Sequence, residues 1–171
     1  MQHWFYEQLA MYAAYHQDSR NKATHHVGVP LIVFSLLVLT AGWPVISLAG
    51  ISVSAAGVLI GVLLLGYLVC VPRIGLVAVG FYGLLLWLAE RLAADEAGGR
   101  WLVFIVAFVL GWMIQFVGHA FEGRRPALFD NLLQIFVAPA FLIAELFFAL
   151  GLETRLLEEI NRRSPRYHAQ S

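Results

Sequence analysis

Charged residues are scarce in this chain, and they make up only 13% of its 171 residues. Cysteine occurs once, as Cys70, which excludes both a disulfide framework and a cluster of thiolate metal ligands. The sequence shows no repeat and no low-complexity tract, and its formal net charge is zero, so we expect no nucleic-acid partner. A basic stretch before the first apolar run is also missing, so we expect residues 1–26 to be retained rather than cleaved as a signal.

Apolar residues are abundant instead. They make up 60% of the chain, against roughly 45–50% in soluble domains, and the mean hydropathy is +0.75. The sequence therefore predicts an all-α, polytopic membrane helical bundle, residues 1–171 forming one integral membrane domain. Within it we expect an interfacial helix and motif in 1–26, the bundle in 27–150 and a polar tail in 151–171. Runs of membrane-spanning length are found at Val27–Leu48, Ile51–Val71, Ile74–Ala89, Trp101–Phe121 and Leu132–Leu150.

The basic residues favour four crossings, with the last apolar segment returning to the side from which it entered. Only Arg91 and Arg100 then lie on one side, and the positive-inside rule places the opposite, basic side in the cytoplasm. Gln134, Pro139 and Glu145 within that segment also favour re-entry, because a proline removes a helix hydrogen bond and a carboxylate is costly at depth. A kinked fifth crossing is the alternative. The basic side would hold Arg20, Lys22, Arg73, Arg124, Arg125, Arg155, Arg162, Arg163 and Arg166.

Residues 3–16 have the spacing of an amphipathic helix, with Phe5, Leu9, Tyr12 and His16 on one face. We expect this helix to lie at the membrane interface. The second and third apolar segments have almost no polar side chains and many glycines, which predicts a scaffold of closely approaching helices. These glycines are Gly57, Gly61, Gly66, Gly75, Gly80 and Gly83.

Two stretches of mixed polarity, residues 15–30 and 115–131, contain most of the histidines. Imidazole is costly near hydrocarbon unless it is paired, bound to metal or in contact with water. Four crossings would bring both stretches to the same membrane face, where His16, His25 and His26 could meet the second stretch. His25 and His26 point about 100° apart on a helix, so we expect only one of them to be a ligand.

In the second stretch, Gln115, His119 and Glu122 follow spacings of four and three, which places them on one helical stripe. Histidine nitrogens with one carboxylate suit non-haem Fe(II), and zinc would accept the same atoms. From spacing alone, hydrogen-bonded histidines without a metal remain an equal alternative.

Two further features have more than one interpretation. Arg124 and Arg125 either fix the topology by their charge or form a fork for a carboxylate head group. Glu145 needs a partner if it is buried, and an arginine or a histidine of the site could provide it.

The order of these residues resembles the small membrane family of 2-hydroxy fatty acid dioxygenases over nearly the whole chain. The matching features are Tyr15-His16, Asn21, His25, Pro30, the run GHAFEGRRPALFDNLLQ at residues 118–134, Pro139 and Glu145. Both motifs are long, ordered and separated by bare hydrophobic segments.

The resemblance implies an Fe(II)-dependent enzyme of fatty-acid alpha-oxidation, with a 2-hydroxy fatty acid and dioxygen as substrates. It implies the endoplasmic reticulum in a eukaryote and the inner membrane in a bacterium, and a homodimer is left open. By this resemblance the metal ligands are His16, His25, His119 and Glu122. Arg124 or Arg125 would steady the carboxylate and Tyr15 or Tyr12 would supply a proton. The supporting residues would be Asn21, Gln115, Glu145 and His26, although the family pattern does not demand a histidine at His26.

Three other functions compete with this one. A membrane di-iron hydroxylase requires more histidines than this chain places near the membrane. A non-catalytic metal or lipid carrier could use the same ligands, but transporters usually place polar groups at the midplane of the membrane. In a structural membrane protein the histidines would simply be hydrogen bonded.

Overall fold

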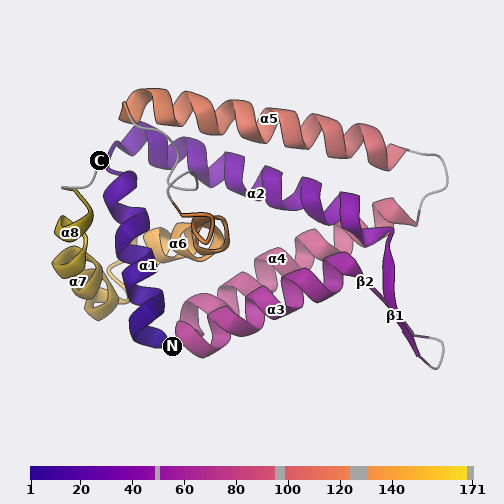
Figure 1. Cartoon of the computed structure of the whole chain (residues 1–171), viewed down its shortest axis with the longest axis horizontal. Coiled ribbons are helices and arrows are strands. Elements are labelled where there is room, and N and C mark those ends of the chain that lie inside the picture. Colours follow the sequence, from indigo (N-terminus) through magenta and orange to yellow (C-terminus); the bar gives the residue numbers. More distant parts are fainter. Residues whose placement is uncertain (49–50, 95–98, 124–130, 169–171) are drawn as a thin grey trace.

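The computed structural model describes residues 1–48, 51–94, 99–123 and 131–168. Most of these residues are helical, which confirms the predicted all-α bundle of membrane-like helices (Figure 1). The elements are α1 Gln2–Tyr15, α2 Ser19–Ala41, β1 Pro44–Leu48, β2 Ile51–Ser54, α3 Ala55–Cys70, α4 Pro72–Ala93, α5 Gly99–Glu122, α6 Gln134–Ala149, α7 Thr154–Arg163 and α8 Pro165–His168.

Helices α2 and α5 form the most extensive helix pair of the molecule. They run side by side in opposite directions, so the start of α2 and the end of α5 lie at the same end, next to α1 (Figure 1). Glycines make this packing close. A Cβ atom on Gly28 would lie 3.0 Å from the Gly111 carbonyl oxygen, and one on Gly118 would collide with the side chains of Thr24 and Asn21.

The glycines of α3 and α4 behave differently from the prediction. A Cβ added to Gly61, Gly66, Gly80 or Gly83 would meet no atom of the described chain within 4 Å. The close approach between the two helices is at Gly75, where α4 begins against the backbone of Tyr67 and Leu68 in α3, while a Cβ on Gly57 would meet the preceding Val53 at 3.3 Å. The expectation that the glycines of this pair allow close helix packing is therefore wrong at these four positions.

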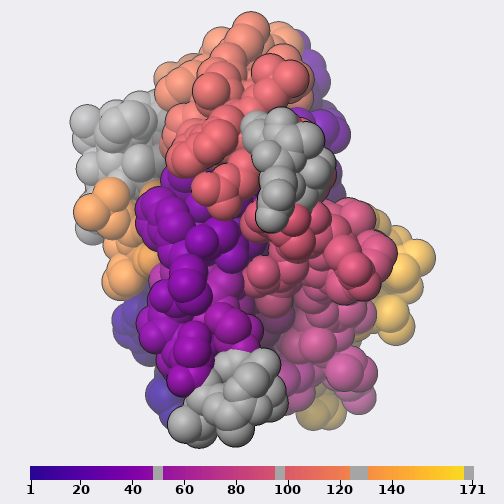
Figure 2. Space-filling view, turned by 90° about the vertical axis from the view of Figure 1, so that its right-hand side faces the viewer, coloured from indigo at the N-terminus to yellow at the C-terminus, as the bar shows by residue number. Residues whose placement is uncertain are grey.

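The predicted first and second apolar segments are not each one continuous helix. Residues 44–54 contain an antiparallel hairpin of β1 and β2, with Leu48 opposite Ile51. Pro44 follows the end of α2 directly, and a proline cannot continue the helical hydrogen-bond pattern. Figure 2 shows this end of the molecule, where the hairpin segment lies beside α4 and below α5.

Three helices, α2, α4 and α5, are long and apolar enough to cross a membrane. Helix α3 has 16 residues and is shorter than a typical span. Helix α6 covers most of the fifth predicted segment as one helix, and the chain bends by 118° after it, between α6 and the Thr154–Tyr167 region. Gly151 and Glu153 adopt positive φ angles of 72° and 53° at this bend. The number of four crossings stays a prediction.

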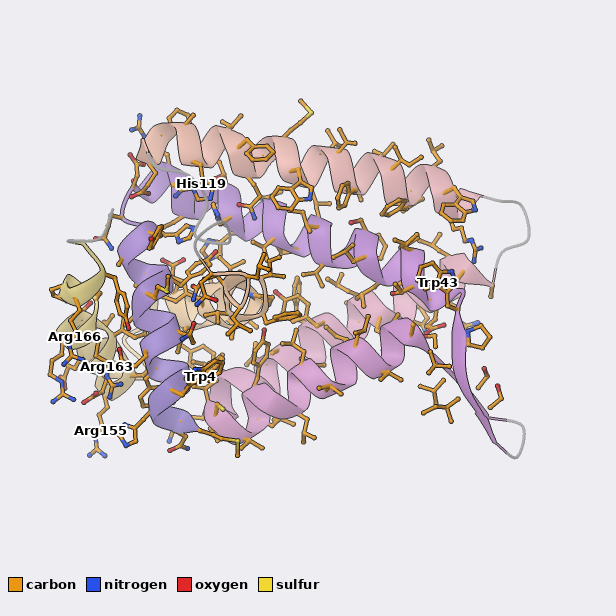
Figure 3. All side chains as sticks on the ribbon, in the orientation of Figure 1. Trp4, Trp43, His119, Arg155, Arg163 and Arg166 are labelled. Carbon is orange, nitrogen blue, oxygen red and sulfur yellow. The ribbon has the colours of Figure 1, made fainter. Side chains whose placement is uncertain are left out.

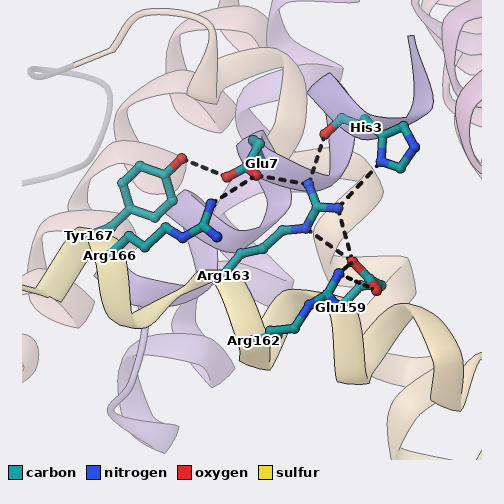
Figure 4. Close-up of polar contacts among 7 residues, drawn as sticks. All are labelled: His3, Glu7, Glu159, Arg162, Arg163, Arg166 and Tyr167. Atoms are coloured by element: carbon teal, nitrogen blue, oxygen red, sulfur yellow. Dashed lines mark hydrogen bonds and ion pairs between the residues drawn. The ribbon is translucent and has the colours of Figure 1, made fainter.

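Helix α1 buries the face that its spacing predicts, with Phe5, Leu9 and Tyr12 packed inside the protein. The C-terminal helices fasten its outer side (Figure 4). Arg163 donates to Glu7 Oε1 at 2.8 Å and to the His3 carbonyl oxygen at 3.2 Å. This clasp of α7 on α1 holds in place the helix that ends at His16.

Candidate metal centre

Three histidines from separate elements meet inside the protein. His16 follows the end of α1, His25 lies in the second turn of α2 and His119 lies in the last turn of α5. They are buried, with exposed fractions of 2%, 4% and 6%. One ring nitrogen of each lies within 4.8 Å of the others. In Figure 3 the labelled His119 points from α5 towards α1 and α2.

Two of these rings have a fixed orientation. His16 donates from Nδ1 to the Tyr12 carbonyl oxygen at 2.7 Å, and His25 donates from Nδ1 to the Asn21 carbonyl oxygen at 2.8 Å. A carbonyl only accepts, so both Nδ1 atoms must be protonated. Burial lowers the pKa of the His16 imidazole well below its usual range.

The remaining nitrogens of these rings face each other, with His16 Nε2 and His25 Nε2 only 3.1 Å apart. In two neutral rings each Nε2 has a lone pair directed into the same space, so the pair needs a proton or a metal ion there. Two nitrogens bound to one metal at about 2.1 Å and roughly at a right angle would lie about 3 Å apart. The observed distance and the Nδ1 bonds to carbonyl oxygens therefore fit a metal-binding pair.

Three imidazoles suit iron, zinc, copper or nickel. Because only three such ligands are brought together among the described residues, positions on an ion would remain open for further ligands. The group fits a catalytic centre better than a closed structural one.

The structure does not bring Glu122 into this group. Its Oε1 accepts from the Gln17 backbone N–H, and its Oε2 accepts from the Asp18 backbone N–H and from Asn21 Nδ2, each at 2.9 Å. Glu122 thus ties the end of α5 to the turn between α1 and α2. Asn21 connects this contact to the three histidines, since its carbonyl oxygen orients His25.

An apolar cavity of about 140 Å³ opens beside the three histidines. Its apolar walls come mainly from α2 and α5, with a smaller part from α6. The lining residues besides the histidines are Tyr12, Val29, Ile32, Val33, Leu36, Phe108, Trp112, Gln115, Gln134, Ile135 and Ala138.

Of the two tyrosines considered from the sequence, Tyr12 lines the cavity and Tyr15 does not. The Tyr12 ring stacks on His16 with 4.0 Å between centroids and 12° between planes. Tyr15 is buried in a separate group with Ala14, Met11 and Tyr167. The signal for Tyr12 was present in the sequence, because it precedes His16 by four residues on one helical face.

His26 and Glu145 lie outside the centre and form a second polar group. The His26 Nδ1 atom donates to the Lys22 carbonyl oxygen at 2.8 Å, and its Nε2 is 3.9 Å from Glu145 Oε2. The closest partner of Glu145 is Lys22 Nζ, at 3.3 Å. Sequence reasoning missed Lys22, which lies one turn before His26 on α2. Gln115 is buried and lines the cavity, whereas Arg124 and Arg125 lie outside the described residues.

Residues 2–150 match the family model described as "Mpo1-like: 2-hydroxy-palmitic acid dioxygenase Mpo1-like". The chain is 36% identical to the 2-hydroxy-palmitic acid dioxygenase MPO1 of Saccharomyces cerevisiae, over 95% of this chain and 94% of the yeast protein. No solved structure matches the chain.

Proposed function

Because the chain belongs to the Mpo1-like family of 2-hydroxy-palmitic acid dioxygenases, we propose that it is an Fe(II)-dependent dioxygenase that shortens 2-hydroxy fatty acids by one carbon. The observation that supports this most directly is the set of three buried histidines at the side of an apolar cavity. This combination suits a reaction at the polar end of a long apolar molecule.

In this proposal His16, His25 and His119 hold the metal. Iron bound by them would supply the redox chemistry and the open positions that dioxygen requires. The bonds from His16 and His25 to backbone carbonyl oxygens keep both Nε2 atoms available as ligands. Glu122 acts on the site indirectly, by fixing the turn between α1 and α2 against α5.

The reaction balances without an external reductant. A 2-hydroxy acid and one dioxygen give the acid one carbon shorter, carbon dioxide and water, and the substrate supplies all four electrons. The bond between the carboxyl carbon and C2 breaks, and C2 becomes the new carboxyl carbon. No nicotinamide, flavin or 2-oxo acid is consumed.

The apolar lining of the cavity supports an acyl chain as part of the substrate. Val29, Ile32, Val33 and Leu36 follow one face of α2 away from His25, and the lining from α5 faces them. The described lining residues include no lysine, arginine, aspartate or glutamate. An apolar tail can therefore be buried along α2 while its carboxylate stays at the histidines, with Arg124 or Arg125 as its proposed partner.

The direct test uses the full chain, purified in detergent and supplied with Fe(II), 2-hydroxypalmitate and dioxygen. We expect one oxygen consumed for each pentadecanoic acid formed, measured by an oxygen electrode and by chromatography. A chelator should stop both signals, and palmitate should give no product. Stoichiometric binding of metal and acid without any loss of carbon would contradict the proposal and support a non-catalytic carrier.

A further inference from the structure

Several residues around the cavity have a buried polar atom that finds no hydrogen-bond partner in the described part of the chain. These atoms are the Tyr12 hydroxyl, Trp112 Nε1, Gln115 Oε1 and Gln134 Oε1. They come from α1, α5 and α6 and so surround the cavity from separate elements. Buried polar groups are nearly always hydrogen bonded, so an accumulation of exceptions around one cavity indicates a polar ligand.

Two of the residues that carry these atoms, Tyr12 and Gln115, neighbour the histidines of the candidate metal centre. The Tyr12 ring is stacked on His16. Gln115 lies one turn before His119 on α5, and its side chain packs against α2, where a Cβ on Gly28 would be 3.1 Å from Gln115 Cγ. Both residues are at least nine-tenths buried, with exposed fractions of 4% for Tyr12 and 7% for Gln115. Packing therefore holds both side chains near the histidines.

The chemistry of the two groups is complementary to a 2-hydroxy acid. A tyrosine hydroxyl can donate to a carboxylate, which only accepts. An amide oxygen only accepts, so its natural partner is a hydroxyl that donates. A fatty acid without the 2-hydroxyl group offers an acceptor for Tyr12 but no donor for the Gln115 oxygen.

We propose that Tyr12 and Gln115 recognise the substrate head group directly, with the Tyr12 hydroxyl donating to the carboxylate and the Gln115 amide oxygen accepting from the 2-hydroxyl. This inference rests on the proposed function. It makes Gln115 the residue that distinguishes 2-hydroxy acids from ordinary fatty acids. In the complex with an ordinary fatty acid the Gln115 oxygen stays buried and unpaired, and this cost makes ordinary fatty acids bind more weakly than 2-hydroxy acids.

The test measures binding to the metal-free full chain in detergent, so that its outcome does not depend on turnover. Titrations of 2-hydroxypalmitate and palmitate would be followed by tryptophan fluorescence. The wild type should prefer the hydroxy acid by about tenfold or more. Gln115→Met should weaken only the hydroxy acid and remove the preference. Tyr12→Phe should weaken both acids by about tenfold.

Thermal unfolding separates this role from a structural one. Tyr12→Phe removes an unpaired buried hydroxyl, so its melting temperature should stay equal or rise. Tyr67 provides the matched control, because its buried hydroxyl donates to the Phe136 carbonyl oxygen and does not line the cavity. Tyr67→Phe should lower the melting temperature and leave both dissociation constants unchanged.

A wild type that binds the two acids equally, or a Gln115→Met variant that keeps the wild-type preference within twofold, would overturn the inference. Unchanged binding of both acids by Tyr12→Phe would do the same, and the glutamine result decides alone if that variant does not fold. The proposed function fails in a different way, through a preference for 2-hydroxypalmitate with no loss of carbon when Fe(II) and dioxygen are supplied.

Discussion

The helix pair α2–α5 and the helix pair α3–α4 are both apolar and rich in glycine, yet they differ in what the glycines contact. Gly28, Gly111 and Gly118 lie where α2 and α5 touch, and a Cβ at any of them would meet atoms of the other helix at 3.1 Å or less. In α3 and α4, four glycines face open space. Glycine content alone therefore does not show where helices approach closely.

The polar residues follow the same division. The α2–α5 pair buries Asn21, His25, Gln115 and His119, whereas the buried residues of α3 and α4 are apolar apart from two tyrosines. In α2–α5 three close glycine contacts and buried polar groups thus occur together, whereas in α3–α4 the close approach at Gly75 has apolar surroundings. We interpret α2–α5 as the element that positions the site and α3–α4 as its support.

The largest effects should come from the histidines themselves. The variants His16→Ala, His25→Ala and His119→Ala should each lose bound iron and lower activity by more than about a hundredfold. Loss of a residue that only hydrogen bonds to a metal ligand costs up to about a hundredfold, so loss of the ligand itself should cost more. Iron content by atomic absorption and oxygen uptake are the measurements. His26→Ala is the matched control, since its ring contacts Lys22 and Glu145 outside the group. Equal damage from His26→Ala would show that the ligand set is wrong.

The second largest effect is expected for Glu122→Gln, which weakens the contact between the end of α5 and the turn that joins α1 to α2. Glutamine keeps the shape but has one acceptor oxygen where Glu122 uses two. We expect iron to bind about tenfold more weakly, because His25 is oriented through Asn21, while full occupancy is still reached at high Fe(II). The matched control is Glu90→Gln, which changes a carboxylate in α4 that accepts from Ser54 at the end of β2, and it should leave the iron affinity unchanged.

Titration with Fe(II) distinguishes this role from direct ligation. If Glu122→Gln fails to bind iron at any concentration, as the histidine variants should, then Glu122 is a ligand, as its spacing from His119 predicts. A wild-type affinity would show instead that the turn between α1 and α2 does not need this carboxylate.

The sequence predicts the helix class and the residues that come together better than it predicts their roles. Periodicity identified the buried face of α1, and the shared end of the two mixed stretches follows from the alternating directions of the helices. Glu122 accepts from the backbone N–H groups of Gln17 and Asp18. Because every residue except proline has a backbone N–H group, the identities of these residues do not predict the contact. Hydropathy likewise missed the hairpin at residues 44–54, because its apolar residues extend the flanking apolar runs.

Gly118→Ala should have a moderate effect on both stability and activity. The added methyl group would collide with Thr24 and Asn21 and push α5 from α2 beside His119. Overpacking of this kind costs about 1–3 kcal/mol. The melting temperature and the rate of oxygen uptake should therefore both be lower than in the wild type. Gly83→Ala in α4, where a Cβ meets nothing within 4 Å, should be neutral or stabilise by about 0.5–1 kcal/mol. Equal effects of the two substitutions would contradict the division between the helix pairs.

The smallest effect on the chemistry is expected at the clasp of the C-terminal helices, which stabilises α1 but does not touch the cavity. Arg163 is buried between Glu7 and Glu159, so Arg163→Met should destabilise the protein by about 1–3 kcal/mol by removing charge-assisted hydrogen bonds. Arg155→Met, at an exposed position on the same helix, is the control and should leave the melting temperature unchanged. At a temperature where both variants are folded, they should have the KM and kcat of the wild type. A lower kcat for Arg163→Met alone would show that the position of His16 depends on the clasp, and that the site extends beyond α2–α5.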